Sequence, residues 1–124
     1  MLDGTRIELL LRNLIGNART HGHNPAKPPE LTVDHQTDTI TISLRDYGHG
    51  IPEHLIEKVT EPFYRADSSR TPKTGQGGSG LGLYLIKLIA EAHGGSLMID
   101  SVINTPDGKQ TNTGTTFTIK LPVT

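Results

Sequence analysis

The sequence predicts a two-layer α/β sandwich of the α+β class, with helices on one face of a mixed, mainly antiparallel sheet. The chain has 124 residues, which suits one domain with one hydrophobic core. Apolar residues recur at helical spacing in two long segments and alternate with polar ones in four short segments. The resulting order is helix, two strands, short helix, loop, helix, two strands, without an internal repeat. That order is typical of a sheet with its helices on one face.

The first element is a helix expected over residues 4 to 20. Asp3 is a candidate N-cap, and Gly22 with Pro25 ends the run. Six apolar residues share one stripe at about 100° per residue: Ile7, Leu10, Leu11, Leu14, Ile15 and Ala18.

Four strands are expected, as two hairpins. In the first, Leu31 and Val33 alternate with polar residues, and so do Ile40, Ile42 and Leu44, so both strands are expected to be half-buried. A polar turn at residues 36 to 39 joins them. The second pair covers residues 96 to 102 and 115 to 121, joined by a long polar loop.

The middle of the chain holds a short helix, a loop and a second long helix. Residues 53 to 59 are expected to be helical, with Pro52 suited to the first position. Residues 64 to 78 have one Ala and one Tyr as their only apolar side chains, so a mobile loop is expected. The next helix ends at Gly94-Gly95. Its buried face is expected to hold Leu81, Leu85, Leu88 and Ala92, broadened by Ile86 and Ile89.

Composition excludes several classes of function. Twelve Lys and Arg oppose thirteen Asp and Glu, so no basic field favours nucleic acid. The absence of Cys excludes disulfides, thiolate nucleophiles and cysteine zinc sites. No apolar run of about 18 residues and no signal peptide is present, so direct membrane insertion is not expected. The six His residues lack metal-ligand spacing and are expected at the surface.

Asp46 is the first candidate site residue, because it continues the core-facing row of Ile42 and Leu44. A buried carboxylate is costly unless it is hydrogen-bonded. Gly48 and Gly50, in the sequence DYGHGIP, leave space beside it for a flat ligand, and an acceptor facing a slot suits an adenine amino group. The alternative is that Asp46 caps this turn through its own backbone, and the residues leave both open.

Asn13 and Asn17 form a second candidate. They are four residues apart and share a helix face at the edge of the apolar stripe. Two amides there could line a polar cleft, and an Asn oxygen is a suitable ligand for Mg²⁺. The alternative is two surface or capping amides.

The glycine-rich segment GQGGSGLGL, residues 75 to 83, leads into the second long helix, whose free N–H groups favour phosphate. Gly75, Gly77 and Gly80 match a dinucleotide fingerprint, with Asp100 twenty residues on, so half of a Rossmann fold is a rival. No β run precedes the segment, and no Gly-Lys-Ser/Thr ending follows. Both familiar forms of the loop are therefore weakened.

In order, these motifs resemble the ATP-binding catalytic domain of sensor histidine kinases, within the GHKL superfamily of gyrase, heat-shock chaperone and mismatch-repair ATPases and its Bergerat-type fold. The resemblance covers nearly all of residues 1 to 124, as one catalytic domain. Residues 3 to 7 and 13 to 18 resemble the asparagine box, DYGHGIP the first glycine box, and residues 61 to 65, EPFYR, the phenylalanine box. GSGLGL resembles the second glycine box, and GTTF at residues 114 to 117 the closing Gly-Thr-x-Phe strand.

The resemblance implies ATP and Mg²⁺ as cofactors. Asp46 would accept a hydrogen bond from the adenine amino group, and Asn17 would coordinate Mg²⁺, with Asn13 on the same face. Residues 64 to 78 would be the ATP lid, anchored by Phe63. Arg65 ranks first for neutralising charge on the transferring phosphoryl group. The other residues implied at the nucleotide are Gly48, Gly50, Ile51, Arg70, Gly78, Ser79, Gly80, Leu81, Gly82, Leu83 and Thr116.

The resemblance also favours a kinase over an ATPase. ATP-hydrolysing relatives carry a water-activating Glu where this chain has Asn13. None of the six His residues is followed by Asp or Glu, so the acceptor histidine is expected on a separate dimerisation and phosphoacceptor domain. A response regulator is the expected downstream partner. The strand that the family usually places before the first helix is missing, so a longer parent protein is expected. The resemblance implies a cytoplasmic location for the domain, within an inner-membrane sensor.

Two departures keep other functions open. Thr20 and His21 stand where relatives often have a basic residue and then Tyr, so one phosphate contact is lost or taken over by Arg19. A degenerate nucleotide sensor that binds without transfer is therefore an alternative. A serine kinase of the anti-sigma type would carry an acidic residue in place of Asn13. A scaffold without nucleotide would leave Asp46 facing the core without a reason.

Overall fold

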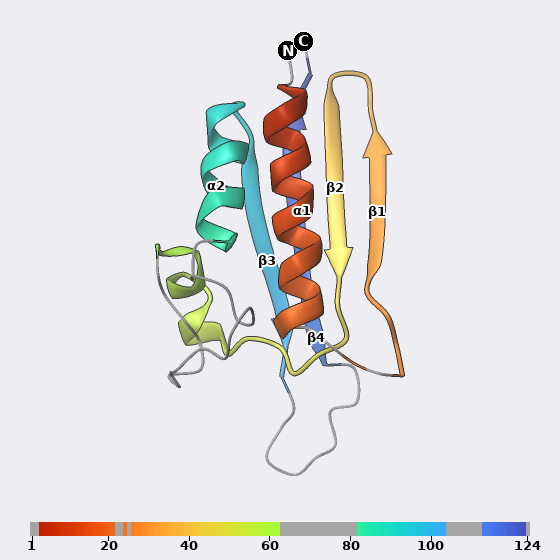
Figure 1. Ribbon diagram of the computed structural model, residues 1–124, viewed down its shortest axis with the longest axis vertical. Helices are drawn as coiled ribbons and strands as arrows, with labels where there is room; N and C mark the ends of the chain where they lie inside the picture. The colour runs from red at the N-terminus through yellow and green to blue at the C-terminus, as the bar shows by residue number, and fades with distance from the viewer. Residues whose placement is uncertain (1–2, 22–23, 25, 63–81, 104–112, 124) are drawn as a thin grey trace.

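The computed structural model describes residues 3–21, 24, 26–62, 82–103 and 113–123, with the side chains of residues 20 and 21 excepted. Figure 1 shows two helices side by side on the same face of one sheet, which confirms the predicted fold class. The elements are α1 (Gly4–His21), β1 (Glu30–His35), β2 (Thr39–Arg45), the short 3₁₀ turns η1 (Glu53–Leu55) and η2 (Lys58–Thr60), α2 (Gly82–Ala92), β3 (Ser96–Val102) and β4 (Gly114–Pro122).

The sheet has four described strands in the order β1-β2-β4-β3. All three pairings are antiparallel, so the described strands hold no parallel pair of the kind that a mixed sheet contains. β4 lies between β2 and β3, where Phe117 stands opposite Leu44 on one side and Ile99 on the other. Both predicted hairpins are confirmed.

Helix α1 begins where the sequence predicts. One carboxylate oxygen of Asp3 accepts hydrogen bonds from the backbone N–H groups of Thr5 and Arg6, at 3.1 and 3.2 Å. This side chain satisfies two of the free donors in the first turn, which is the function of an N-cap. Leu10 and Leu14, at the centre of the predicted apolar stripe, are fully buried in the core.

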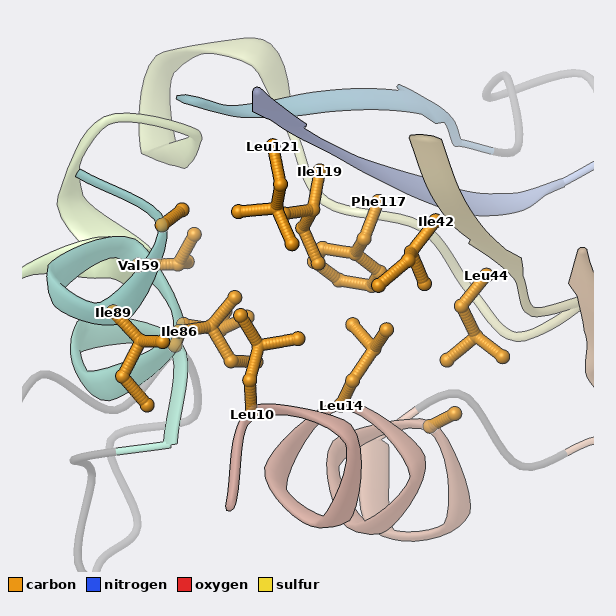
Figure 2. Packing of buried hydrophobic residues seen from close by; sticks show 13 residues of the cluster. Leu10, Leu14, Ile42, Leu44, Val59, Ile86, Ile89, Phe117, Ile119 and Leu121 are labelled. Carbon is orange, nitrogen blue, oxygen red and sulfur yellow. The ribbon is translucent and has the colours of Figure 1, made fainter. Parts of the chain in front are cut away.

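The core lies between the two helices and the helix-facing side of the sheet (Figure 2). Its largest fully buried side chains are Phe117, Leu10, Leu14, Ile86, Ile119 and Leu121. Because such side chains are close-packed, truncating one leucine to alanine costs about 2–5 kcal/mol. This layer fixes how α1 and α2 stand relative to the strand ends.

The predicted buried face of α2 is confirmed at Ile86 and Ile89 and is wrong at Leu88 and Ala92. Leu88 is 43% exposed and Ala92 is exposed, whereas Leu83, Ile86, Ile89 and Ala90 are buried. The helix is apolar on nearly every side, so its periodicity does not distinguish the face that α1 and the sheet cover.

Strand β1 also differs from expectation, because every one of its residues is exposed. Leu31 and Val33 are 45% and 60% exposed. β1 is the edge strand beyond β2, and in Figure 1 neither helix lies over it. The alternating pattern identified a strand correctly, but burial depends on a covering helix that this edge lacks. The predicted helix at residues 53 to 59 is likewise replaced by η1 and η2.

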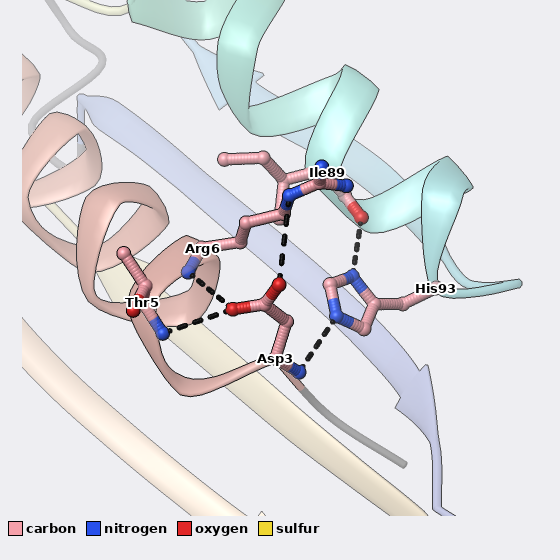
Figure 3. A network of polar contacts seen from close by, with 5 residues as sticks. All are labelled: Asp3, Thr5, Arg6, Ile89 and His93. Atoms are coloured by element: carbon pink, nitrogen blue, oxygen red, sulfur yellow. Dashed lines mark hydrogen bonds and ion pairs between the residues drawn. The ribbon is translucent and has the colours of Figure 1, made fainter.

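His93 connects the two helices at the end of the molecule where the chain termini lie (Figures 1 and 3). Its Nε2 accepts a hydrogen bond from the backbone N–H of Asp3 at 3.1 Å, and its Nδ1 lies 2.8 Å from the carbonyl oxygen of Ile89. A carbonyl can only accept, so Nδ1 carries the proton and the imidazole is neutral. His93 is half-buried, and this contact gives it a structural role that its surface assignment did not include.

Candidate functional site

The predicted site residues gather at the opposite end of the molecule. Figure 1 shows that the end of α1, the start of α2, the end of β2 and the start of β4 all lie at this end. α1 and α2 run in opposite directions along the sheet, and β2 runs opposite to β4. The residues after β2 therefore meet the beginning of β4, and the last turns of α1 lie at the same end of the molecule.

Asp46 is buried at this end, with 4% of its surface exposed, as its parity predicts. Its backbone N–H donates to the carbonyl of Thr115 at 2.9 Å. Its Oδ1 accepts two backbone N–H groups, from Gly48 and from Thr115, each at 3.1 Å. The carboxylate therefore caps its own turn, as one alternative proposed, and is tied to β4 as well.

The second carboxylate oxygen of Asp46, Oδ2, has no hydrogen-bond partner among the residues that the structure describes. A buried acceptor without a donor is costly and is found mostly where a ligand or water supplies the donor. The two interpretations of Asp46 are therefore compatible, because Oδ1 organises the turn while Oδ2 remains available to a ligand N–H.

Thr115, and not Thr116, faces the same side as Asp46. Thr115 is 2% exposed and its N–H bonds Asp46, whereas Thr116 alternates to the other face of β4, between Arg45 and Asp100 in the register. The side chain of Thr116 therefore lies on the face of β4 away from Asp46, and its assignment to the nucleotide stays a prediction. Strand parity could have identified Thr115, since it shares the row of Phe117, Ile119 and Leu121.

The first glycine box is held against the strand ends by close backbone contact. Gly50 has φ of +84°, and a Cβ there would lie 2.2 Å from the carbonyl oxygen of Val102. Gly114 has φ of +143°, and a Cβ there would lie 2.1 Å from the carbonyl oxygen of Asp46. The space at Gly50 is therefore filled by β3, which corrects the expectation that this glycine leaves a slot for a flat ligand. Gly48 is buried and donates to Asp46.

Asn13 and Asn17 both lie on α1, and they differ in whether their side-chain amides are hydrogen-bonded. The Nδ2 of Asn13 donates to the carbonyl of Leu9 at 2.8 Å, and its Oδ1 lies 3.6 Å from the position of a Cβ on Gly82. Asn17 is half-buried, and its amide has no hydrogen-bond partner among the described residues. An uncommitted amide oxygen fits a Mg²⁺ ligand. The described residues contain no cluster of three His, Cys, Asp or Glu, so other ligands would come from phosphate and water.

Other predicted residues divide into two groups. Leu83 is 9% exposed and its side chain packs in the hydrophobic core, while its assignment to the nucleotide stays a prediction. Ile51 packs partly against the core, and Gly82 begins α2. The lid at residues 64 to 78 falls outside the described residues, as do Phe63, Arg65, Arg70, Gly78, Ser79, Gly80 and Leu81. The side chains of Thr20 and His21 are outside them too.

Tyr47 is a neighbour of the site that the sequence did not single out. Its hydroxyl donates to Glu30 at 2.8 Å, and its backbone carbonyl accepts from the side-chain amide of Asn24 at 2.8 Å. The Lys27 ammonium and the Arg45 guanidinium lie 5.2 and 4.9 Å from the ring centroid, as in cation–π pairs. The hydrogen bond to Glu30 raises the pKa of Tyr47 above its ordinary value of 10.0, more than Arg45 lowers it. These contacts fasten the α1–β1 connection to the residue after Asp46.

None of the helices in the described ranges is long and apolar enough to span a membrane.

The sequence matches, over residues 2–124, the family described as histidine kinase-, DNA gyrase B- and HSP90-like ATPase. It is 40% identical over 121 residues to the signal transduction histidine-protein kinase AfsQ2 of Streptomyces coelicolor, covering 98% of this chain and 20% of AfsQ2. It is 38% identical over 122 residues to the sensor histidine kinase WalK of Bacillus subtilis, covering 98% and 18%. The chain thus spans about a fifth of the length of these relatives.

Solved structures agree with this relationship. The mycobacterial sensor histidine kinase MprB superposes with a TM-score of 0.76 at 26% identity, over 97% of this chain and 72% of that one. The catalytic domain of histidine kinase ThkA superposes with a TM-score of 0.69 at 28% identity, over 98% and 69%. The relatives and solved structures named here are histidine kinases, and the chain belongs to the histidine kinase-, DNA gyrase B- and HSP90-like ATPase family.

Proposed function

We propose that this domain binds Mg-ATP at the Asp46 end of the sheet and transfers the γ-phosphoryl group to a histidine on a separate dimerisation and phosphoacceptor domain. The observation that carries the proposal is the buried Oδ2 of Asp46, which lacks a donor among the described residues. A response regulator is the downstream partner in this proposal. The domain works in the cytoplasm, within a longer inner-membrane sensor.

Adenine recognition follows from how Asp46 is held. Two backbone N–H groups bind Oδ1, so the carboxylate cannot rotate freely. The direction in which Oδ2 can accept a hydrogen bond is therefore fixed. An amino group supplies the missing donor there, whereas a carbonyl in the same position would repel the carboxylate. The site should therefore prefer adenine to hypoxanthine.

Phosphate binding uses the start of α2 in this proposal. α2 begins at Gly82, so its first-turn N–H groups are free to bind an anion, and the helix dipole favours negative charge there. Asn17 holds the metal in this proposal through its uncommitted amide. Mg²⁺ bound there would neutralise phosphate charge during transfer.

Asn13 favours transfer over hydrolysis. An amide cannot take a proton from water, and the Asn13 nitrogen is already hydrogen-bonded to the carbonyl of Leu9.

Residues 64 to 78 are the ATP lid in this proposal, and Phe63 anchors it. Arg65 ranks ahead of Arg70 as the cation at the γ-phosphate. Gly78, Ser79, Gly80 and Leu81 then carry the backbone that approaches the phosphates.

Calorimetric titration with ADP and IDP tests the adenine contact. The intact chain should bind ADP about tenfold or more tightly than IDP, since one hydrogen bond to a charged group is worth about 1.5–3 kcal/mol. Asp46→Asn should lose this preference, and Asp100→Asn is the matched control because it removes the same charge from an exposed position. Equal binding of ADP and IDP by the intact chain would refute the adenine contact.

A second experiment separates the kinase from the degenerate sensor. The chain is mixed with γ-labelled ATP, Mg²⁺ and the purified acceptor domain of its own parent protein, and label on the acceptor histidine is counted. Asn17→Ala should abolish labelling and the Mg²⁺ dependence of nucleotide binding. Tight ATP binding without any labelled acceptor would favour the sensor.

A further inference from the structure

Ser101, near the end of β3, connects three parts of the candidate site through one hydroxyl. Its Oγ accepts the backbone N–H of Ile51 at 2.6 Å and donates to the carbonyl of Gly114 at 3.0 Å. It also lies 2.9 Å from Oγ1 of Thr115. No sequence motif singled out this residue.

The donor inventory sets the direction of each bond. A serine hydroxyl has one proton and two lone pairs. Because the Gly114 carbonyl can only accept, the Ser101 hydroxyl donates its one hydrogen bond to that carbonyl. The remaining lone pair receives the Thr115 hydroxyl proton, beside the N–H of Ile51. Every bonding position of Ser101 is then used, and Thr115 has its N–H on Asp46 and its O–H on Ser101.

These bonds tie down both ends of residues 46 to 51. At the first end, the backbone N–H of Asp46 donates to the Thr115 carbonyl, and the backbone N–H of Thr115 donates to the Asp46 carboxylate. At the other end, the backbone N–H of Ile51 donates to Ser101 of β3, next to the close approach of Gly50 to the Val102 carbonyl. The segment that carries Asp46 is therefore anchored to the sheet at each end.

We propose that Ser101 is a positioning residue for nucleotide recognition, which holds Asp46 and Thr115 in register through Ile51, Gly114 and the Thr115 hydroxyl. The proposal rests on the proposed function, in that the group it positions is the adenine acceptor Oδ2. It assigns to Ser101 no contact with the nucleotide itself. Removing its hydroxyl should loosen Asp46 while the apolar core stays packed.

Amide hydrogen exchange in the nucleotide-free protein tests the positioning directly. The amides of Gly48 and Thr115 bond Asp46 and not Ser101, so they report on the carboxylate. Ser101→Ala should speed exchange at both about tenfold, equivalent to one lost hydrogen bond. Ser101→Thr keeps the hydroxyl and should restore protection, and Ser96→Ala, at an exposed position of the same strand, is the control. Unchanged protection at Gly48 and Thr115 in Ser101→Ala would overturn the proposal.

Nucleotide binding supplies the second measurement. Ser101→Ala should weaken ADP about tenfold and IDP much less, because only ADP uses the positioned acceptor, whereas a merely structural loss would lower the melting temperature and leave the ADP to IDP ratio unchanged. That unchanged ratio would also overturn the proposal. If the intact chain binds neither nucleotide, the proposed function fails, and the exchange result still decides whether Ser101 positions Asp46.

Discussion

The side-chain oxygen of Asn13 lies 3.6 Å from the position that a Cβ on Gly82 would occupy, so the two helices meet where α2 begins. The distance is an ordinary van der Waals contact, and nothing else lies within 4 Å of that position in the described structure. The absence of a side chain at Gly82 is therefore not required by packing. It leaves the first turn of α2 open beside Asn13.

Gly82→Ala should raise stability and weaken nucleotide binding. Alanine reduces the backbone entropy of the unfolded chain and favours the helix, which contributes about 0.4–1 kcal/mol. The added methyl group covers the helix start at which phosphate is proposed to bind. Urea unfolding and ATP-analogue titration measure the two effects. Gly4→Ala, at the first residue of α1 with nothing within 4 Å, should stabilise without changing affinity. Unaltered affinity in Gly82→Ala would argue against phosphate at this helix start.

Gly114→Ala should be strongly destabilising. The new Cβ would lie 2.1 Å from the Asp46 carbonyl oxygen, and the φ of +143° disfavours any side chain. Backbone atoms of two paired segments cannot both move without losing hydrogen bonds, so a loss of about 3 kcal/mol or more is expected. The denaturation midpoint measures it. Gly16→Ala, with open space around it in α1, should show no loss. A Gly114→Ala protein as stable as the parent would contradict this packing.

The His93 contact should be energetically independent of the Asp3 side chain. His93 accepts the Asp3 backbone N–H, while the Asp3 carboxylate caps α1 (Figure 3). His93→Ala should cost about 1–2 kcal/mol and Asp3→Ala about 1 kcal/mol. A double-mutant cycle on unfolding free energies should give a coupling below about 0.5 kcal/mol, because Asp3→Ala leaves the N–H in place. A coupling above about 1 kcal/mol would mean that the imidazole depends on the carboxylate.

Tyr47 should titrate above its ordinary pKa of 10.0, because its hydroxyl donates to Glu30 and its ionised form would be repelled by that carboxylate. The folded protein holds this proton more tightly than the unfolded chain, so the stabilisation is fully present below about pH 10 and is lost as pH rises through the folded pKa. NMR titration of the assigned ring signals measures it. Glu30→Gln should lower the pKa of Tyr47, whereas the exposed Glu57→Gln should leave it unchanged. A pKa that does not respond to Glu30→Gln would remove Glu30 as its cause.

Local patterns predicted most elements because each depends on neighbours in the chain. The stripe of α1, its Asp3 cap and the alternation of β2 and β4 were all readable from spacing. The inward direction of Asp46 followed from the same alternation. Strand parity also predicts that Thr115, and not Thr116, faces the same side as Asp46.

Burial and site geometry required the tertiary structure. α2 is apolar on most sides, so its periodicity predicted Ile86 and Ile89 in the core, and its packing against α1 and the sheet decided for Leu83 and Ala90 in place of Leu88 and Ala92. β1 has a correct strand pattern and no helix above it, which leaves Leu31 and Val33 exposed.

The sequence by itself determined the order of elements, the family and the inward carboxylate at Asp46, because these follow from periodicity and from motifs of adjacent residues. Only the tertiary structure decided that Asp46 Oδ1 is shared by Gly48 and Thr115 while Oδ2 has no donor in the described part of the chain, and that Ser101 joins Ile51 to β4. The residues in each of these sets lie far apart in the chain, and hydrogen bonds between distant segments are set by strand register and packing rather than by local sequence.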